Sequence, residues 1–290
     1  MLSKYLFGIF SLLSLFCCGH LAAGKAGALL ATGAENSGNT NCSAPLVSVQ
    51  QQPPLDTTTA RVYFIENLGS TINTSYPEYS AVFTEDHRTI MFTTKRASQQ
   101  QIEEGAAAED ILVATMDEKD EWQKPEKMRK LSTYGNDATV QLFDNDSKMI
   151  IYQRGDLLIT ELDLDNKKWG KPESLGKSIN HRGSRESHGF IFNNGNSLIF
   201  SSSYKTKRKD LDLFISTKSN GEWTNARPLN EINTPYDEDS PFVAEDGTLY
   251  FSSQGHNSTG GFDIFASHFN QTTQRFEKPV NMGAPLNSQA

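Results

Sequence analysis

The sequence predicts an all-β fold, a β-propeller of four-stranded antiparallel blades, because one pattern repeats along most of the chain. Two unrelated landmarks recur: a proline that closes a segment, at 125, 172, 228 and 279, and an aspartate that opens an apolar run, at 110, 156, 212 and 263. Successive prolines are 47, 56 and 51 residues apart, and successive aspartates 46, 56 and 51. Each unit holds three clear strand-length runs and a weaker fourth. Four strands in about 50 residues, repeated, are typical of propeller blades.

The last unit shows the pattern of one blade most clearly. Phe242–Ala244 and Leu249–Phe251 are short apolar runs, and Glu245–Gly247 lies between them. Its Asp-Gly pair supplies the positive backbone angles that a tight hairpin turn needs. Gly260 and Gly261 then turn the chain into a third run, from Asp263 to Ser267. This pattern predicts an antiparallel meander.

The repeats place a propeller domain at 60–290, with blades at about 70–131, 132–180, 181–233 and 234–290. Residues 61–69 resemble the exit of a further blade, and 285–288 resemble the lead-in to another. The interpretation we favour is an incomplete ring of four blades plus one N-terminal strand, from a six-bladed or larger propeller. The alternative is a closed ring of four blades with an extra edge strand.

The N-terminal residues 1–24 have the pattern of an export signal, with Lys4 before an apolar stretch too short to span a membrane comfortably. Two processing sites compete. The small residues at 22–24 suit ordinary signal cleavage, whereas residues 15–18 resemble a bacterial lipobox with Cys18 as the lipidated residue. Residues 25–59 are polar and lack periodicity, so we expect a flexible linker.

Composition excludes several classes of function. The net charge of −8 disfavours nucleic acid and anionic bilayers as partners. Neither the three cysteines nor the six histidines show metal-ligand spacing, so no metal or cofactor is predicted. No Gly-x-Ser-x-Gly motif is present, which disfavours a serine hydrolase with a nucleophile elbow.

The fourth unit resembles the WD-like β-propeller repeat of TolB-type periplasmic proteins and of OmpA-linked outer-membrane proteins. The residues that carry the resemblance are Tyr236-x-Glu238, Ser240-Pro-Phe242, Asp246-Gly247, Gly260-Gly-x-Asp-Ile264 and Asn281-Met-Gly283. The resemblance implies a bacterial exported protein in the periplasm or at the outer membrane. It also implies protein, peptidoglycan or other glycan partners at the cell envelope, although the propeller fold alone does not determine function.

Charged residues in the loops at one end of the blades are the candidate binding residues. The loops before each innermost strand carry acids and the loops between the middle strands carry bases, and both sets emerge on the same face of a propeller. The candidates are Glu78, Asp137, Glu186, Glu238 and Asp239, with Arg96, Arg154, Lys207 and Arg208. One interpretation is a charged rim that binds a ligand. The other is that the acids pair with neighbouring bases or cap backbone amides, since every blade repeats them.

Three functions remain open at this point. The one the sequence favours is a non-enzymatic interaction module at the bacterial envelope, of undetermined oligomeric state. An alternative is a carbohydrate-active hydrolase or lyase, which requires two suitably spaced rim carboxylates. The third is a part of a larger OmpA-linked or secretion-system protein.

Overall fold

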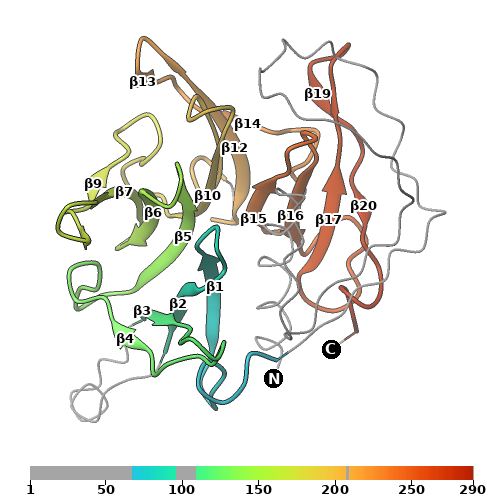
Figure 1. Ribbon diagram of the computed structural model, residues 1–290. Coiled ribbons are helices and arrows are strands. Elements are labelled where there is room, and N and C mark those ends of the chain that lie inside the picture. Colours follow the sequence, from blue (N-terminus) through green and yellow to red (C-terminus); the bar gives the residue numbers. More distant parts are fainter. Residues whose placement is uncertain (1–66, 96–108, 207–208, 290) are drawn as a thin grey trace, which may run out of the picture.

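The computed structural model describes residues 67–95, 109–206 and 209–289, and these residues form strands, turns and loops without a helix. Four antiparallel sheets stand around a common centre, with the first strand of each sheet nearest to it (Figure 1). The prediction of an all-β propeller with four antiparallel blades is confirmed. The expected strand at 61–65 and the signal and linker segments lie outside the described residues.

Each blade runs from its innermost to its outermost strand in chain order. Blade 1 comprises β1 (Glu78–Phe83), β2 (Thr89–Thr94), β3 (Asp110–Thr115) and β4 (Glu126–Lys127). Blade 2 comprises β5 (Asp137–Phe143), β6 (Lys148–Gln153), β7 (Asp156–Asp163), β8 (Lys168–Trp169) and β9 (Glu173–Ser174). Blade 3 comprises β10 (Glu186–Phe192), β11 (Ser197–Ser202), β12 (Asp212–Ser219), β13 (Glu222–Trp223) and β14 (Arg227–Pro228). Blade 4 comprises β15 (Glu238–Val243), β16 (Leu249–Ser253), β17 (Asp263–Ser267) and β20 (Val280–Asn281), with β18 (Phe269–Asn270) and β19 (Arg275–Phe276) as a separate pair.

The weak fourth strand is short in every blade and is divided in blades 2 and 3. In blade 2, β8 and β9 both pair with β7, and in blade 3, β13 and β14 both pair with β12. The hairpin turn of blade 4 also differs in detail from the expectation. Gly247 has φ of +81°, whereas Asp246 is not among the residues with positive φ. The turn therefore uses a single left-handed residue, which glycine adopts at little cost.

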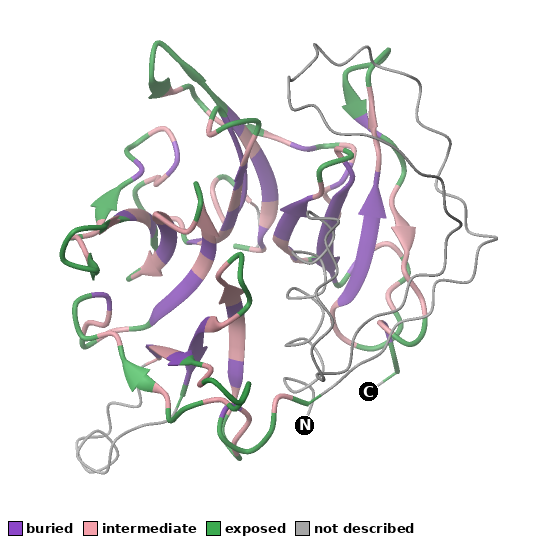
Figure 2. Cartoon of the chain, viewed as in Figure 1, coloured by how far each residue is buried: buried purple, intermediate pink, exposed green. Residues whose placement is uncertain are grey.

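The apolar cores lie between neighbouring blades. One core joins Ile199 and Leu213 of blade 3 to Phe251 and Phe265 of blade 4, and similar cores join blades 1 and 2 and blades 2 and 3. Trp169, Trp223 and Phe276 pack against or within these cores, and Trp122 packs against a further core of blade 1. Buried residues line the inner strands, and exposed residues gather at the turns and at the short outer strands (Figure 2).

A repeated asparagine fastens the third strand of a blade to the loop that leaves the blade. The Asn233 side chain accepts a hydrogen bond from Leu213 N at 2.8 Å and donates one to Leu213 O at 3.0 Å. Asn180 bonds both backbone groups of Leu157 in this way, and Asn287 those of Ile264. Each loop end is thereby held against its own blade, which fixes where the next innermost strand begins.

Within the described part of the chain, no helix is long and apolar enough to cross a membrane.

Candidate active site in the central channel

The carboxylates that begin the innermost strands are buried and hydrogen-bonded inside the protein. Glu78, Asp137, Glu186 and Glu238 are between 0% and 4% exposed. The Glu238 carboxylate accepts from Thr234 N at 2.7 Å, from Thr234 Oγ1 at 2.6 Å and from Ser253 Oγ at 2.6 Å. These contacts satisfy the hydrogen-bonding groups of the turn that leads into β15. They fit the structural interpretation, in which the repeated acids cap backbone amides.

The same arrangement recurs in the other blades. Asp137 accepts from the backbone and hydroxyl of Thr133, and Glu78 from those of Thr74. Glu186 accepts from Ser184 Oγ and Ser202 Oγ, both at 2.6 Å. Burial raises the pKa of Asp137, Glu186 and Glu238 despite these bonds. The described residues therefore do not present a pair of accessible carboxylates at these positions, and the rim-carboxylate mechanism has no geometric support here.

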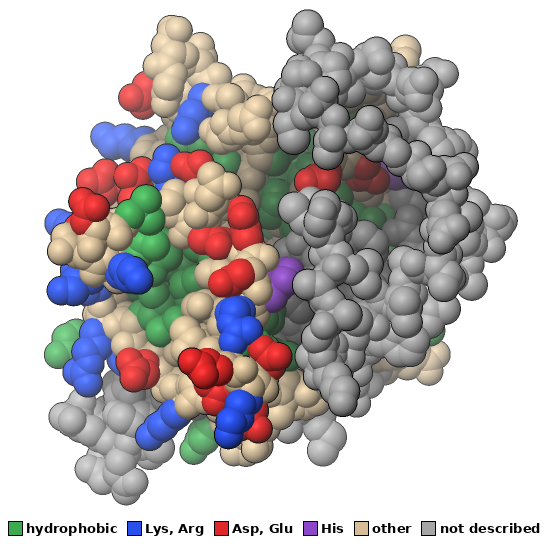
Figure 3. Space-filling model, in the orientation of Figure 1, with side chains coloured by type: hydrophobic (Ala, Val, Ile, Leu, Met, Phe, Trp, Pro, Cys, Tyr) green, Lys and Arg blue, Asp and Glu red, His purple; other side chains and the backbone are tan. Residues whose placement is uncertain are grey.

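Of the candidate bases, only Arg154 is described; Arg96, Lys207 and Arg208 lie outside the described residues. Arg154 packs against Gly135, and its backbone amide donates to Asn136 O at 3.4 Å. The positive charge of Arg154 therefore lies beside the lead-in loop that contains Asp137. Basic and acidic side chains are mixed on the face seen in Figure 3, without a patch of a single sign over the described residues.

A β-bulge interrupts each innermost strand between its second and fourth residues. The third residues of the four strands are Ser80, Thr139, His188 and Ser240. Thr139 Oγ1 donates to Ser80 O, which joins the bulges of blades 1 and 2. A hydroxyl therefore stands at three of the four equivalent positions, and His188 departs from the repeat.

His188 contacts two side chains from two other blades. Its Nε2 lies 3.1 Å from Ser80 Oγ on β1, and its Nδ1 lies 3.0 Å from Asp239 Oδ1 on β15. Among the four innermost strands, β15 is the one with an acid at its second position, where Tyr79, Ala138 and Ser187 stand in the other blades. The three side chains form a continuous Ser–His–Asp hydrogen-bond chain, in which Ser80 is 108 residues from His188.

Further contacts fix the carboxylate of Asp239. Its Oδ1 accepts from Ser187 Oγ at 2.9 Å and from Ser240 N at 2.8 Å. The Asp239 and His188 side chains are only 16% and 24% exposed. A carboxylate held in this way orients the imidazole and favours the tautomer that carries its proton on Nδ1.

The electrostatics of the pair follow from this geometry. Burial opposes the charge on Asp239, but His188 and the hydrogen bonds to the carboxylate outweigh it and lower the pKa of Asp239 to about 2. For His188, burial alone would lower the pKa, and the charge and hydrogen bond of Asp239 raise it above its ordinary value. Asp239 is thus ionised at neutral pH, and His188 is a stronger base than a free imidazole.

The triad borders a cavity of about 200 Å³. Its lining combines Ser80, His188 and Asp239 with mainly apolar residues, among them Ala81, Val140, Pro241 and Phe262. The lining residues come from the innermost strands, from the end of β16 and from the loop after it. These residues lie toward the face that carries the lead-in loops, so the cavity belongs to that end of the channel.

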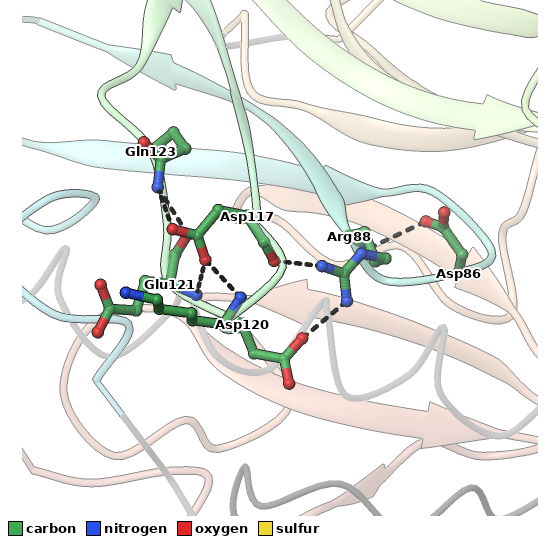
Figure 4. A network of polar contacts seen from close by, with 7 residues as sticks. Asp86, Arg88, Asp117, Asp120, Glu121 and Gln123 are labelled. Carbon is green, nitrogen blue, oxygen red and sulfur yellow. Dashed lines mark hydrogen bonds and ion pairs between the residues drawn. The ribbon is translucent and has the colours of Figure 1, made fainter.

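A second polar network lies at the other ends of the blade 1 strands. Arg88, in the β1–β2 turn, donates to Asp120 Oδ1 at 2.7 Å and to Asp117 O, in the β3–β4 connection (Figure 4). The Asp117 carboxylate accepts from Lys119 N, Glu121 N and Gln123 Nε2. These groups satisfy one another within one blade, and Arg88 and Asp120 are 43% and 47% exposed. The network joins two turns and offers no reactive group.

Sequence reasoning named Asp239 but missed Ser80 and His188. The available signal was limited to His188, which stands where the other three innermost strands carry a hydroxyl, whereas the residue at the position of Asp239 differs in every blade.

Comparison with known proteins supports the fold only. No protein-family model and no curated protein matches the sequence. Among solved structures, the tricorn protease has 12% identity and a TM-score of 0.46, over 74% of this chain and 19% of that one. An endo-arabinase from Bacteroides thetaiotaomicron has 10% identity and a TM-score of 0.45, over 72% of this chain and 81% of that one. A periplasmic gluconolactonase from Pseudomonas aeruginosa has 8% identity and a TM-score of 0.40, over 69% of this chain and 56% of that one. These are β-propeller proteins, and none shows a TolB-type family for this chain.

Proposed function

We propose that the protein is a hydrolase that cleaves an ester bond at the Ser80–His188–Asp239 triad. The observation that carries the proposal is the hydrogen-bond chain from Ser80 Oγ through both nitrogens of His188 to Asp239, at the wall of a cavity. A hydroxyl is a weak nucleophile unless a base accepts its proton, and an imidazole held by a carboxylate is suited to that task.

The chemistry follows from the positions of the three groups. Ser80 Oγ attacks the ester carbonyl carbon while its proton passes to His188 Nε2. The imidazolium is stabilised by the charge of Asp239. Collapse of the tetrahedral intermediate breaks the bond to the alcohol, which leaves with the proton from Nε2 and produces an acyl-Ser80. Water then attacks the acyl group with His188 as base, which releases the acid and restores Ser80.

The negative oxygen of the intermediate needs hydrogen-bond donors near Ser80. The bulge in β1 places Ser80 and Ala81 opposite one residue of β2, so the ladder is interrupted beside the nucleophile. We propose that the backbone amides of this bulge supply these donors.

Hydrolysis of p-nitrophenyl butyrate tests the proposal. Ser80→Ala and His188→Gln should lower kcat/KM by about 10³-fold or more, and Asp239→Asn by about 10²-fold or more. Ser216→Ala is the matched control, because it removes a buried hydroxyl that is bonded to Thr224 O in blade 3, outside the channel. The Ser216→Ala variant should keep the wild-type kcat/KM. Absence of hydrolysis by a folded wild-type protein would overturn the proposal.

A structural role for the triad makes a different prediction. If it only joins β1 to β10 and β15, Ser80→Ala should lower the melting temperature while the wild-type protein shows no esterase activity.

Exposed tyrosines favour a second candidate function, the interaction module. Tyr76, Tyr134 and Tyr236 are 45%, 99% and 56% exposed, and all three lie in lead-in loops of different blades. Two of these loops are held by a hydrogen bond. The hydroxyls of Thr74 and Thr234 accept from the backbone amides of Tyr76 and Tyr236, each at 3.2 Å. Such rings can stack on sugars or pack on a protein. We propose that this face binds a protein or glycan at the bacterial envelope, as the TolB-like resemblance implies.

A triple Tyr→Ala variant at 76, 134 and 236 tests the second function. It should lose binding to isolated peptidoglycan in a sedimentation assay and keep the wild-type melting temperature. Equal sedimentation of variant and wild type would refute binding through this face.

Export, anchoring through Cys18 and placement in the periplasm or outer membrane belong to the same proposal, and mass spectrometry of the mature N-terminus tests them.

A further inference from the structure

The lining and the volume of the channel cavity restrict which substrates the proposed hydrolase can bind. Apart from the triad, the side chains of Ala81, Val140, Pro241 and Phe262 supply apolar surface. A cavity of about 200 Å³ holds on the order of six or seven water-sized groups, since each occupies about 30 Å³. That space fits an ester group and a short acyl chain, and it is smaller than the usual pocket for a drug-sized ligand.

The charges that face the cavity also restrict the substrate. Among its described lining residues, the ionisable groups are Tyr79, His188 and Asp239. Burial and a hydrogen bond with Glu109 keep the pKa of Tyr79 far above its ordinary range, so its hydroxyl stays neutral. When His188 acts as a base it is neutral, and Asp239 then leaves one negative charge at the wall. An acyl chain that ends in a carboxylate would be repelled and would lose its hydration.

We infer that the cavity accepts an uncharged acyl group of about four carbons and leaves the alcohol portion of the ester at the mouth of the channel. This inference rests on the proposed hydrolase function and specifies its substrate class. Val140 lines the cavity from β5, which belongs to the one blade that supplies no member of the triad.

A chain-length series of p-nitrophenyl esters tests the inference. From acetate to butyrate, kcat/KM should rise roughly fourfold for each methylene group buried. It should then fall at least tenfold for octanoate and laurate, which exceed the cavity. A hemisuccinate ester should react at least tenfold more slowly than butyrate.

Two variants of Val140 should move this optimum in opposite directions. Val140→Ala enlarges the cavity and should shift the optimum toward hexanoate or octanoate. Val140→Phe fills it and should reduce butyrate hydrolysis more than acetate hydrolysis. Val113→Ala is the matched control, because Val113 packs in the core between blades 1 and 2 and does not line the cavity. Its chain-length profile should equal that of the wild type.

The outcomes separate the inference from the function on which it rests. If a folded wild-type protein hydrolyses none of the esters, the hydrolase proposal fails. If it hydrolyses them all at similar rates, prefers laurate, or shows the same optimum in all Val140 variants, the small-acyl inference fails while the hydrolase stands.

Discussion

His188 Nδ1 lies 3.0 Å from Asp239 Oδ1, and His188 stands where the other three innermost strands carry a hydroxyl. Repeated features have architectural contacts: the buried acids occur in all four blades, and the asparagine clips, Asn180, Asn233 and Asn287, in blades 2, 3 and 4. The contact between His188 and Asp239 is not repeated in the other innermost strands and lies at the cavity wall, so the blade architecture does not require it. We therefore assign the chemistry of the protein to His188, Asp239 and the Ser80 hydroxyl that His188 contacts.

The esterase rate should depend on pH through His188. Its pKa is raised, and only the neutral imidazole accepts the Ser80 proton, so kcat/KM should fall as the pH decreases through that value. Asp239→Asn removes the charge that raises the pKa, and the midpoint of the remaining activity should move to lower pH. A pH profile of p-nitrophenyl butyrate hydrolysis for both proteins measures the shift. A midpoint that does not move would contradict the role of Asp239.

The same pair should make stability depend on pH in a defined window. The raised pKa of His188 contributes stability that is present below about 6.5 and is lost as the pH rises through the folded value. The lowered pKa of Asp239 contributes stability that is present above 3.8 and is lost as the pH falls toward 2. His188→Gln should therefore destabilise the protein most between about pH 4 and 6.5, by roughly 2–3 kcal/mol for a partly exposed pair.

Thermal melts of wild type and His188→Gln at pH 5, 7 and 9 measure this difference. The gap in melting temperature should be largest at pH 5. A gap that grows toward pH 9 would contradict the charge assignment.

The asparagine clip of blade 3 should contribute measurably to stability. Asn233→Ala leaves Leu213 N and O without their side-chain partner beside a residue that is 0% exposed, which should cost roughly 2–3 kcal/mol. Asn233→Asp keeps an acceptor for Leu213 N but places a carboxylate oxygen against Leu213 O, so it should also be less stable than the wild type. Urea denaturation with equal m-values compares the variants. Equal stability of all three proteins would contradict the clip.

The close approach at Gly255 should make alanine costly there. A Cβ at this position would lie 2.2 Å from Thr234 Oγ1, the hydroxyl that bonds Glu238. Gly255→Ala should therefore displace Thr234 and destabilise the protein by about 2 kcal/mol or more. Gly135→Ala is the matched control, since its Cβ would make only an ordinary contact at 3.5 Å with Arg154. Similar melting temperatures for both variants would refute the stated contact.

The repeat made the blades predictable because Asp110, Asp156, Asp212 and Asp263 each begin the third strand of a blade or precede it directly. Local turn chemistry and apolar runs determine such meanders within about 50 residues. The expected positive φ at Asp246 was wrong in detail, since turn types depend on the strands that the turn connects.

The candidate site was less predictable, for two physical reasons. The charge of Glu238 did not indicate that its side chain would turn inward. The hydroxyl four residues before it, on Thr234, is the partner that bonds the buried carboxylate. The contact of His188 with Ser80 depends on how blades 1 and 3 stand across the channel, which no local pattern encodes. Ser80 also lies in a β-bulge and not in a strand–helix turn, so a search for the usual hydrolase motif does not find it.

Covalent labelling with a fluorophosphonate, followed by mass spectrometry of the peptides, tests the central claim most directly. Such a reagent reacts with a serine hydroxyl that a neighbouring base activates. We predict one labelled residue, Ser80, with labelling abolished in His188→Gln and retained in Ser216→Ala. A folded protein that stays unlabelled, or that is labelled at another serine independently of His188, would contradict the assignment of the triad.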